Sequence, residues 1–461
     1  MKAALNTILR LHRSPRALTI AGSDSGGGAG VQADLKTFAA LGVHGMSALT
    51  SVTAQNTLGV RAVHDVPPGI VKAQIEAVVE DIGVDAAKTG MIHTTSIIEA
   101  VAEEIGKHRL PTVVDPVMVA KSGAVLLQPE AVETLKRRLL PVARVVTPNA
   151  PEAEALSGLK IRSIDDAAAA AKKIADLGPG AVVVKGGHIQ GGSVVDLLYL
   201  DGSLRRFEAE RVSSSATHGT GCSFSAAITA EIAKGKEIVE AVSSAKMLVT
   251  DAIRFGLELG KGHGPVNPLA SLYMGAERCL VIENISEAVS ALESDPCFYR
   301  LVPESQTNLV MALPYASGPE HVAAIPGRIV KLGERVRASA PPRFGASSHV
   351  AATVLTARRY NPEVRAAMNI RFSEKILEAC NRLGLSLSSY DRRLEPVEVK
   401  STEGRSTGWG AEVAIKAAGR VPEVIYHRGD WGKEPMMTIL GRSAVEVAGV
   451  ARRIAAELEE E

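Results

Sequence analysis

The chain alternates short runs of β-branched and aliphatic residues with Ala-rich stretches of helical periodicity over its first 270 residues. The short runs predict strands at Ala17–Ala21, Thr112–Val114, Arg144–Val146, Ala181–Val184 and Asp196–Leu200. The longer stretches predict helices at Val31–Leu41, Val71–Asp81, Pro129–Leu140, Ile164–Leu177 and Ser223–Lys234. This alternation is typical of an α/β fold, a mostly parallel sheet flanked by helices. In such sheets, ligands bind at the carboxyl ends of the strands.

The alternation breaks at Gly262–Pro268, a segment rich in Gly and Pro. We place a domain boundary shortly after it, which gives domains 1–275 and 276–461. In the second domain the pattern predicts helices at Ile285–Leu292, Phe372–Leu383 and Ser443–Leu458, and strands at Asn308–Leu313 and Glu423–Tyr426. We expect a smaller α/β domain there.

Composition narrows the classes of function. Lys plus Arg number 52 against 51 Asp plus Glu, a balance that argues against a nucleic-acid binder. No run approaches the ~18 consecutive apolar residues that a membrane span needs. The four cysteines form no C-x-x-C pair, so we expect neither a zinc site nor a disulfide framework. A reducing cytoplasm is the simplest location.

A glycine-rich loop, Gly22–Gly30, follows the first predicted strand and leads into a helix. It lacks the Lys-Ser or Lys-Thr that ends a P-loop. Gly28, Gly30 and Ala33 fit the spacing of a dinucleotide fingerprint, but no acidic residue follows about 20 residues on to bind a ribose. Two interpretations stay open: a loop that lets a small ligand approach backbone amides, or a tight crossover turn.

A second glycine-rich turn, Thr217–Cys222, precedes the predicted helix at Ser223–Lys234. Backbone N–H groups and the helix dipole at such a start can stabilise the charge on a phosphoryl group in transfer. Cys222 lies where a helix N-terminus lowers a thiol pKa, so it could accept a proton from a hydroxyl. The alternative is a small buried Cys at a helix start.

With both turns in view, the first domain resembles the ribokinase-like superfamily, and within it the bifunctional hydroxymethylpyrimidine/phosphomethylpyrimidine kinases of thiamine biosynthesis. The resemblance is carried, in the family's order, by Ala21–Asp34, Thr53–Thr57, Lys88–Met91, Asp115–Met118, Thr147–Glu152, Val184–His188 and His218–Cys222. One departure is Ser25-Gly26, where the family usually has Pro-Ser.

The resemblance implies that ATP phosphorylates 4-amino-5-hydroxymethyl-2-methylpyrimidine and then its monophosphate, with Mg²⁺. Cys222 would be the catalytic base, in the place of the Asp of related sugar kinases. The implied pyrimidine-binding residues are Gly22, Asp34, Gln55 and Met91. The implied ATP-binding residues are Lys185, Gly219, Thr220, Gly221, Asn149 and His263. Asp115 and Glu152 would orient magnesium through water. For Asn149, a helix N-cap with Pro151 just inside the helix is an equal alternative.

The second domain resembles the N-type thiamine-phosphate synthase domain. The resemblance is carried by Ile325–Arg328, Arg343–His349, Arg365–Arg371, Tyr390–Arg392 and Asp430–Pro435. It implies that the pyrimidine diphosphate condenses with thiazole phosphate to give thiamine phosphate, with release of pyrophosphate.

Such a reaction needs cations and N–H donors around the leaving diphosphate, because the pyrimidinylmethyl carbon can depart as a stabilised cation. The candidate catalytic residues are Arg328 and His349. The candidate substrate-binding residues are Arg343, Ser347, Ser348, Asn369, Arg371 and Lys433. Ion pairing or a capped turn is the structural alternative for Arg328 and His349.

Two other functions stay open at this point. The second domain could sense thiamine phosphate and regulate the kinase, or the first domain could be a related pyridoxal or sugar kinase. The expected partners are small-molecule substrates, the pyrimidine and its phosphates and thiazole phosphate, with neither nucleic acid nor membrane. Because this kinase family commonly forms dimers, we expect a homodimer or a higher homo-oligomer.

Overall fold

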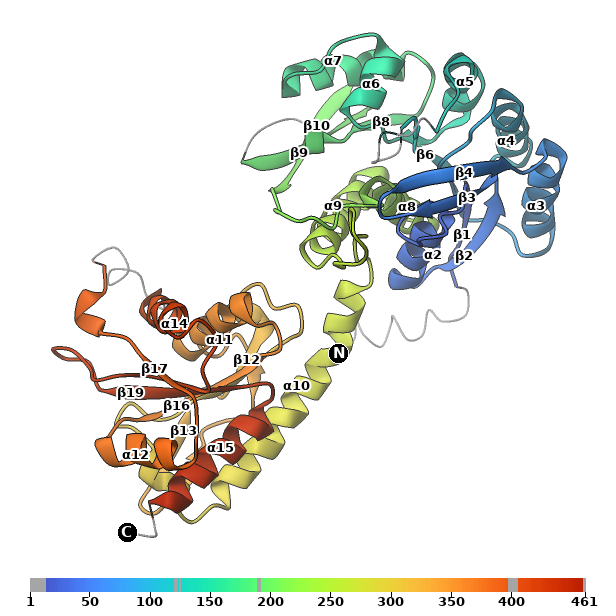
Figure 1. The fold of residues 1–461 in the computed structure, drawn as a ribbon. Helices are drawn as coiled ribbons and strands as arrows, with labels where there is room; N and C mark the ends of the chain where they lie inside the picture. The colour runs from blue at the N-terminus through green and yellow to red at the C-terminus, as the bar shows by residue number, and fades with distance from the viewer. Residues whose placement is uncertain (1–13, 120–122, 124–125, 189–191, 397–404, 459–461) are drawn as a thin grey trace. The chain divides into compact units, whose positions relative to one another are not determined.

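The computed structural model describes residues 14–119, 123, 126–188, 192–396 and 405–458 (Figure 1). The chain divides into two compact units, residues 1–272 and 273–461. Helix α10 begins at Ala270 and continues to Glu293. The boundary expected between residues 275 and 276 therefore lies within a continuous helix.

The first unit is built on an eight-stranded sheet in the order β10-β9-β8-β7-β6-β5-β1-β2. Its strands are β1 (Arg16–Ala21), β2 (His44–Leu49), β5 (Ala86–Thr89), β6 (Thr112–Val114), β7 (Val145–Val146), β8 (Ala181–Val184), β9 (Ser193–Leu200) and β10 (Ser203–Glu210). The strands from β8 to β2 pair in parallel, and β9 and β10 add an antiparallel edge. This confirms the predicted, mostly parallel sheet.

Helices cover both faces of this sheet and complete two apolar cores. On one face lie α3 (Pro68–Asp81), α4 (Thr95–His108), α5 (Pro129–Thr134), α6 (Ala150–Ser157) and α7 (Ile164–Ala175). On the other lie α2 (Gly30–Ala40), α8 (Thr220–Ala233) and α9 (Ile238–Arg254). The small residues of α8 allow close packing, and its ten residues from Ser223 to Ile232 are all buried.

Two details of the first unit differ from a simple α/β alternation. The helix expected at Pro129–Leu140 is α-helical only to Thr134, and a π-helix at Leu135–Leu139 and a 3₁₀ turn at Leu140–Val142 follow. Pro141 explains this end, because it lacks an N–H and cannot continue the helical hydrogen bonds. A separate hairpin, β3 (Ser51–Asn56) and β4 (Gly59–Asp65), extends from the end of β2.

The second unit is an α/β domain with a seven-stranded sheet in the order β15-β12-β11-β16-β19-β18-β17. Its strands are β11 (Leu309–Ala312), β12 (Val322–Ala324), β15 (Arg343–Phe344), β16 (Ala366–Arg371), β17 (Leu387–Ser389), β18 (Val424–His427) and β19 (Met436–Gly441). All neighbours pair antiparallel except β17 and β18. A hairpin of β13 (Ile329–Leu332) and β14 (Arg335–Ala338) lies outside this sheet.

Helices again cover both faces. One apolar core is formed with α10, α12 (Glu374–Arg382) and α15 (Ala444–Glu457), and the other with α11 (His349–Tyr360) and α14 (Arg405–Ala418). A 3₁₀ turn, η4 (Phe298–Leu301), packs against α15. No helix in the described part of the chain has both the length and the apolarity to cross a bilayer.

Candidate active sites

Five predicted residues of the first unit follow the carboxyl ends of adjacent parallel strands. Gly22 follows β1, Met91 follows β5, Asp115 follows β6, Asn149 follows β7 and Lys185 follows β8. The topology therefore gathers these residues along one edge of the sheet, where ligands of α/β folds bind.

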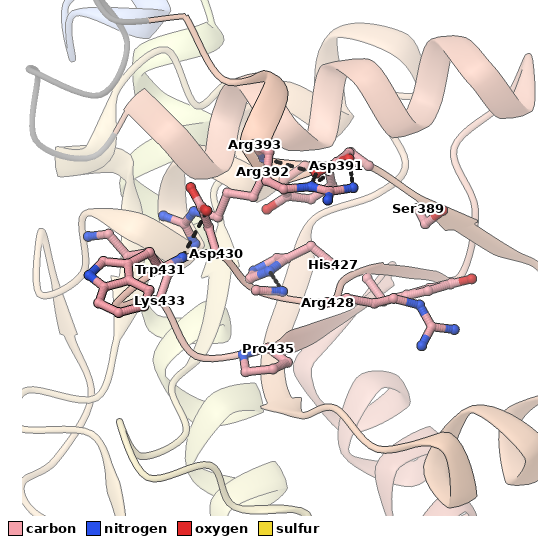
Figure 2. A pocket seen from close by; sticks show the side chains of 13 residues that line it. Ser389, Asp391, Arg392, Arg393, His427, Arg428, Asp430, Trp431, Lys433 and Pro435 are labelled. Atoms are coloured by element: carbon pink, nitrogen blue, oxygen red, sulfur yellow. Dashed lines mark hydrogen bonds and ion pairs between the residues drawn. The ribbon is translucent and has the colours of Figure 1, made fainter.

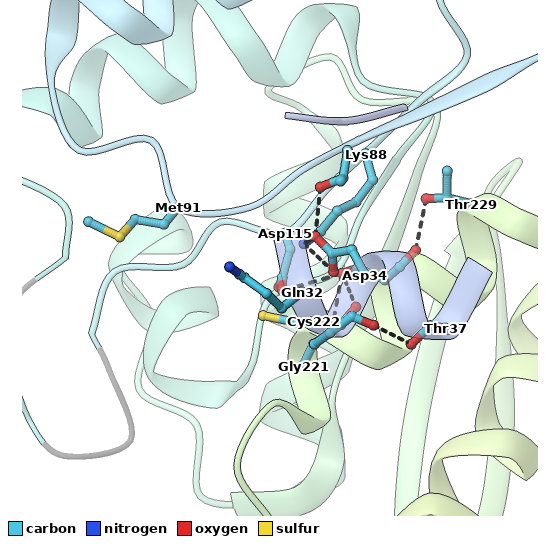
Figure 3. A network of polar contacts seen from close by, with 12 residues as sticks. Gln32, Asp34, Thr37, Lys88, Met91, Asp115, Gly221, Cys222 and Thr229 are labelled. Atoms are coloured by element: carbon cyan, nitrogen blue, oxygen red, sulfur yellow. Dashed lines mark hydrogen bonds and ion pairs between the residues drawn. The ribbon is translucent and has the colours of Figure 1, made fainter. Parts of the chain in front are cut away.

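Cys222 lies in the first turn of α8, near a fully buried ion pair. Lys88 Nζ, on β5, lies 3.0 and 2.8 Å from the two carboxylate oxygens of Asp34 on α2. Thr19 on β1 donates its hydroxyl to the same carboxylate at 2.6 Å. Figure 3 shows the Cys222 sulfur pointing away from this pair, to the side on which Met91 lies.

The position of Asp34 differs from the one we expected. Its side chain is fully buried, and Lys88 and Thr19 occupy its carboxylate. Burial opposes the charge on Lys88, but the carboxylates of Asp34 and Asp115 raise its pKa. Asp34 therefore holds a buried ammonium group near Cys222 instead of presenting an open acceptor to a pyrimidine.

Burial also affects the protonation of the Cys222 thiol. It raises the pKa of the thiol to about 11, and the carboxylates of Asp34 and Asp115 contribute to the rise. The ammonium group of Lys88 and the amide of Gly30 oppose this shift without reversing it. The pKa lowering expected from the helix N-terminus is wrong, because burial and the neighbouring carboxylates raise the pKa of the thiol.

Lys185 bridges the two predicted magnesium residues. Its Nζ donates to Asp115 Oδ1 at 2.8 Å and lies 3.9 Å from Glu152 Oε2. Burial raises the pKa of Glu152 to about 7, with Lys185 opposing and Asp115 assisting the rise. A Cβ on Gly221 would lie 3.3 Å from Lys185 Nζ and 3.6 Å from Asp115 Oδ2, so this cluster lies directly against the start of α8.

Asn149 and Glu152 form a reciprocal capping box at the start of α6. Asn149 Oδ1 accepts the Glu152 N–H at 2.9 Å, and Glu152 Oε2 accepts the Asn149 N–H at 2.8 Å. The N-cap alternative for Asn149 is therefore confirmed, with Pro151 in the first turn. One carboxylate oxygen of Glu152, Oε2, is therefore already hydrogen-bonded within this cap.

The two glycine-rich turns touch each other. Gly219 adopts a left-handed φ of 81°, and a Cβ there would lie only 1.8 Å from the carbonyl oxygen of Gly28. Thr220 donates its hydroxyl to Thr217 O at 2.7 Å, which closes the turn before α8. The first N–H groups of a helix have no intrahelical acceptor, so the start of α8 presents them to a ligand.

Gly22 and Met91 lie together, as the resemblance implies. A Cβ on Gly22 would lie 2.7 Å from Ser51 Oγ and 3.3 Å from Met91 Sδ. The absence of a side chain at Gly22 therefore lets Ser51 of the β3–β4 hairpin and Met91 after β5 approach the end of the first strand closely.

Gln55 is held by a network that the sequence did not reveal. Its Nε2 lies 3.3 Å from His218 Nε2, which lies 3.0 Å from Asp24 Oδ2. Burial opposes ionisation of Asp24, but hydrogen bonds from His218 and from backbone amides of its own loop lower its pKa. Ser25 exchanges hydrogen bonds of 2.7 and 2.8 Å with the backbone of Gln55, so the departure from the family pattern adds a tether.

His263 is exposed, and its backbone N–H donates to Thr57 O at 3.1 Å. A Cβ on the preceding Gly262 would lie 2.0 Å from the same carbonyl oxygen. The segment is also joined to His218, which exchanges backbone hydrogen bonds with Gly264 and Val266.

The second unit has a pocket of about 730 Å³ at the ends of β17 and β18 (Figure 2). Of the predicted residues it contains Lys433. The lining also brings cations and aromatic rings together: Tyr390, Arg392, Arg393, Tyr426, His427, Arg428 and Trp431. Asp391 and Asp430 are the acidic lining residues, and Asp391 is paired with Arg393 at 2.6 Å. Four cations line the pocket against two carboxylates, and outside the lining Glu395 lies 3.8 Å from Arg392 and Glu374 pairs with Arg428.

His427 is buried at the base of this pocket. Burial lowers its pKa to about 4, and the nearby Arg392 contributes. Its Nδ1 accepts the N–H of Gly429 at 3.1 Å, a bond that requires the neutral ring. His427 therefore shapes the loop that follows β18.

Arg328 lies in an exposed turn that buried amides hold in place. Asn369 Oδ1 accepts the Asn308 N–H at 2.7 Å, and Asn308 binds both backbone groups of Ile325 at 3.0 and 3.1 Å. The side chain of Arg328 donates to Ser305 O, and Ser305 N–H donates to Glu434 at 3.1 Å. Asn369 therefore helps to hold this turn, because its side-chain amide is hydrogen-bonded to the backbone of Asn308 and Gln306.

The remaining predicted residues of this unit are more dispersed. Arg343 is exposed on the edge strand β15, and Ser348 Oγ lies 3.1 Å from Nδ1 of His349 at the start of α11. Ser347 is half-buried just before them. Thr407, on α14, donates to His349 O at 2.7 Å. Arg371 ends β16 and lines a second, smaller depression.

The sequence-based prediction missed several residues of these sites. Lys88 and Arg392 lie within stretches that carried the two resemblances, so a signal was available. Asp24 and His218 also lie within such stretches, but their contact with each other spans 194 residues, and Arg428 pairs with a residue 54 positions away; periodicity cannot show either contact. Within the described residues, no group of three or more His, Cys, Asp or Glu side chains is arranged to hold a metal ion.

Comparison with known proteins identifies both units. Residues 24–267 match the family model of phosphomethylpyrimidine kinase, and residues 284–453 match that of thiamine-phosphate synthase ThiN. These matches confirm the two resemblances and their order along the chain.

Two curated relatives match over the first unit's length. A thiamine biosynthesis bifunctional protein of Geobacter sulfurreducens is 50% identical over 251 residues, which is 54% of this chain and 51% of that protein. The hydroxymethylpyrimidine/phosphomethylpyrimidine kinase of Bacillus subtilis is 50% identical over 258 residues, which is 55% of this chain and 95% of that protein. The match thus spans about half of the first relative and nearly all of the second.

Similar solved structures confirm the ribokinase-like fold. The pyridoxal kinase of Bacillus subtilis in an ADP complex has a TM-score of 0.53 and 42% identity, covering 56% of this chain and 99% of that one. The pyridoxal kinase of Staphylococcus aureus, in complex with AMP-PCP and pyridoxal, has a TM-score of 0.53 and 40% identity, covering 56% and 95%.

Proposed function

Because the chain belongs to the phosphomethylpyrimidine kinase family, we propose that its first unit phosphorylates 4-amino-5-hydroxymethyl-2-methylpyrimidine and then its monophosphate, with ATP as the donor. The observation that carries this proposal is the position of Cys222. It stands at the start of a buried helix, between the Asp34–Lys88 pair and the cluster of Lys185, Asp115 and Glu152.

Phosphoryl transfer depends mostly on positioning and on stabilising the charge of the equatorial oxygens. Lys185 and the amides of Gly219–Cys222 lie together and would bind the phosphates of ATP. The pyrimidine would lie between Gly22, Met91 and Gln55, with its hydroxymethyl group toward Cys222. In its thiolate form, which burial disfavours and Lys88 favours, Cys222 would accept the hydroxyl proton as the oxygen attacks the γ-phosphorus and ADP leaves.

Lys88 has a separate role in this scheme. Its ammonium group favours the thiolate form of Cys222, against the effect of burial. Asp34 holds that ammonium group in place. We therefore propose Asp34 and Lys88 as positioning residues for Cys222.

The residues present fit a magnesium ion. Asp115 and Glu152 place two carboxylates around one ammonium group, at 2.8 and 3.9 Å from Lys185 Nζ. Magnesium prefers hard oxygen ligands and keeps several waters, so two carboxylates suffice. When bound, the ion would neutralise charge on the phosphates.

The kinase proposal is tested by steady-state kinetics of the full chain with ATP and Mg²⁺. We expect both the pyrimidine alcohol and its monophosphate to be phosphorylated. Since the two solved structures described above are pyridoxal kinases, pyridoxal is the comparison substrate. A kcat/KM for pyridoxal that exceeds that for the pyrimidine alcohol would overturn the proposal.

For the second unit we propose thiamine-phosphate synthesis. The supporting observation is the pocket of Figure 2, which combines cations with aromatic rings. Such a pocket suits a pyrimidine diphosphate. The C–O bond to the diphosphate would break with its electron pair leaving on pyrophosphate, and the thiazole nitrogen would form the new C–N bond.

Arg328 and His349 are not among the lining residues of this pocket, and Arg328 is linked to it through a neighbouring segment. Arg328 contacts the loop that Glu434 anchors, beside Lys433. His349 is tied to α14 through Thr407. We propose Arg328 and His349 as the catalytic residues, and Arg343, Ser347, Ser348 and Lys433 as residues that bind the anionic substrates.

The test of this half uses the full chain supplied with pyrimidine diphosphate and thiazole phosphate, without ATP. We expect thiamine phosphate and pyrophosphate in equal amounts. A protein that binds thiamine phosphate but never forms it would instead be a kinase with a sensor domain. We further propose a cytoplasmic homo-oligomer, and light scattering of the purified chain tests the oligomeric part.

A further inference from the structure

His218 lies where the second glycine-rich turn meets two other segments of the first unit. His218 N–H donates to Gly264 O at 3.0 Å, and Val266 N–H donates to His218 O at 3.0 Å. The ring packs against the first glycine-rich loop, where a Cβ on Gly28 would lie only 2.4 Å from His218 Cδ2. These contacts hold both the backbone and the ring of His218 in position, four residues before Cys222.

The ring of His218 binds a carboxylate that backbone amides hold in place. Asp24 Oδ2 accepts the N–H groups of Gly28 and Ala29 at 3.0 and 2.8 Å, and Oδ1 accepts that of Gly26 at 2.8 Å. Burial alone would raise the pKa of Asp24, but the hydrogen bonds from His218 and from these amides lower it. Asp24 is therefore a carboxylate at neutral pH, which can only accept hydrogen bonds. The proton between the two side chains, which are 3.0 Å apart, is thus carried by His218 Nε2.

This proton determines which end of the Gln55 amide can face His218. Gln55 Nε2 lies 3.3 Å from His218 Nε2. A ring nitrogen that carries a proton can donate but cannot accept, so an amide N–H has no acceptor there. The amide oxygen can accept the proton, and a half-turn about the last side-chain bond exchanges the two amide atoms. The contact with His218 therefore favours the oxygen on this side.

Thr53 determines the other end of the same amide. Its Oγ1 donates to Ser23 O at 2.8 Å and lies 3.4 Å from Gln55 Oε1. A hydroxyl has a single proton, so Thr53 can only accept a hydrogen bond from Gln55, and an amide N–H must supply it. Both neighbours are satisfied when the oxygen of Gln55 faces His218 and its nitrogen faces Thr53.

We propose that His218 and Thr53 fix this orientation of the Gln55 amide, and that the orientation selects an aminopyrimidine. The proposal rests on the kinase function proposed above. In this orientation one amide N–H remains for ring N3, and one oxygen lone pair remains for the 4-amino group beside it. The amino group then lies on the His218 side, which directs the hydroxymethyl group on the neighbouring ring carbon toward Cys222. His218 and Thr53 act through Gln55 and are positioning residues, and Asp24 holds the proton on His218.

The kinetic test compares the aminopyrimidine alcohol with its 4-oxo analogue, using the full chain with ATP and Mg²⁺. In its N3–H form the analogue presents the reverse pattern, a donor at N3 and an acceptor on C4, so the fixed amide should reject it. We expect His218→Leu to reduce the ratio of the two kcat/KM values about tenfold or more, because the amide can then turn. If His218 only supported the fold, both values would fall and their ratio would stay the same, which would overturn the proposal.

Matched variants test the two hydrogen bonds separately. His218→Gln, whose amide N–H can still donate to Asp24, should keep most of the preference for the aminopyrimidine. Thr53→Val should lose the preference as His218→Leu does, whereas Thr53→Ser keeps the hydroxyl and should retain it. The control is His64→Leu, an exposed position on the same hairpin, which should behave as wild type. A preference that survives both His218→Leu and Thr53→Val would contradict the assignment.

Calorimetry without ATP separates this proposal from the kinase function. We expect the wild-type chain to bind the aminopyrimidine alcohol more tightly than the 4-oxo analogue, and His218→Leu to lose this preference. That result supports the orientation even if no phosphate is transferred, in which case the kinase proposal alone fails. Equal binding of both pyrimidines by a wild-type chain that phosphorylates normally would overturn the orientation and leave the kinase proposal standing.

Discussion

The ammonium group of Lys88 lies within 3.0 Å of both carboxylate oxygens of Asp34, and neither side chain is exposed to solvent. Three elements meet at this pair: β5 supplies Lys88, α2 supplies Asp34 and α8 supplies Cys222. The Asp34–Lys88 pair therefore contributes both to the packing of these elements and to the surroundings of the proposed base Cys222.

We predict that Lys88→Met destabilises the first unit by about 3–5 kcal/mol, because it leaves the Asp34 carboxylate buried without a cation. Urea unfolding of the full chain measures this change. The control is Lys72→Met, which removes the exposed partner of Glu103 and should change little. Adding Asp34→Leu to Lys88→Met should restore much of the stability, and equal losses for Lys88→Met and Lys72→Met would contradict the prediction.

Cys222→Ala should lower the kinase rate by about 10²–10⁴, the usual contribution of a general base. The variant should still condense pyrimidine diphosphate with thiazole phosphate. Arg328→Ala and His349→Ala should show the opposite behaviour, a normal kinase and a slow synthase. Separate assays of the two reactions check this, and the loss of both activities from one substitution would show that the units are not independent.

The fold of the first unit could be predicted because several of its helices are amphipathic, such as α7, and central strands such as β1 and β8 are continuous apolar runs. The carboxyl-end positions of Gly22, Asp115 and Lys185 followed from that pattern together with the family resemblance. The sequence could not show that Asp34 is occupied by Lys88, which lies 54 residues away along the chain. For the same reason it could not show the raised pKa of Cys222.

The second unit was less predictable because its sheet is made of short antiparallel strands, and β15 has only two residues. Helix α14 contains Gly408 and Gly410, which suggest a break in a helical pattern. The structure shows why a glycine stands at 410: a Cβ there would lie 2.2 Å from the Tyr390 ring. The glycine that this packing requires therefore made the helix hard to recognise from its sequence pattern.

The second unit should lose stability in mild acid because of His427. Its pKa is about 4 when folded against 6.5 ordinarily, so the unfolded chain binds the proton first and stability falls as pH drops from 6.5 toward 4. The contribution is on the order of 3 kcal/mol. His427→Asn should flatten this part of the pH profile of unfolding, while the exposed His64→Asn should leave it as it is. Identical profiles for wild type and His427→Asn would contradict the assignment.

Trp431 should report binding to the larger pocket. The chain has two tryptophans; Trp409 packs edge-on against Tyr390 at 5.9 Å, and Trp431 is 98% exposed beside the pocket. In a Trp409→Phe variant, pyrimidine diphosphate should shift the emission of Trp431 to the blue as the indole leaves water. Pyrophosphate, which has no ring, is the control ligand. An emission spectrum that pyrimidine diphosphate leaves unchanged would exclude a role for Trp431 in binding.

The most direct test of the two-enzyme account supplies the full chain with the pyrimidine alcohol, ATP, Mg²⁺ and thiazole phosphate, and follows every intermediate over time. We predict that the pyrimidine monophosphate and diphosphate appear in sequence and that thiamine phosphate accumulates with pyrophosphate. Accumulation of the diphosphate without thiamine phosphate, in a folded sample that binds thiamine phosphate, would contradict the account and leave a kinase fused to a sensor.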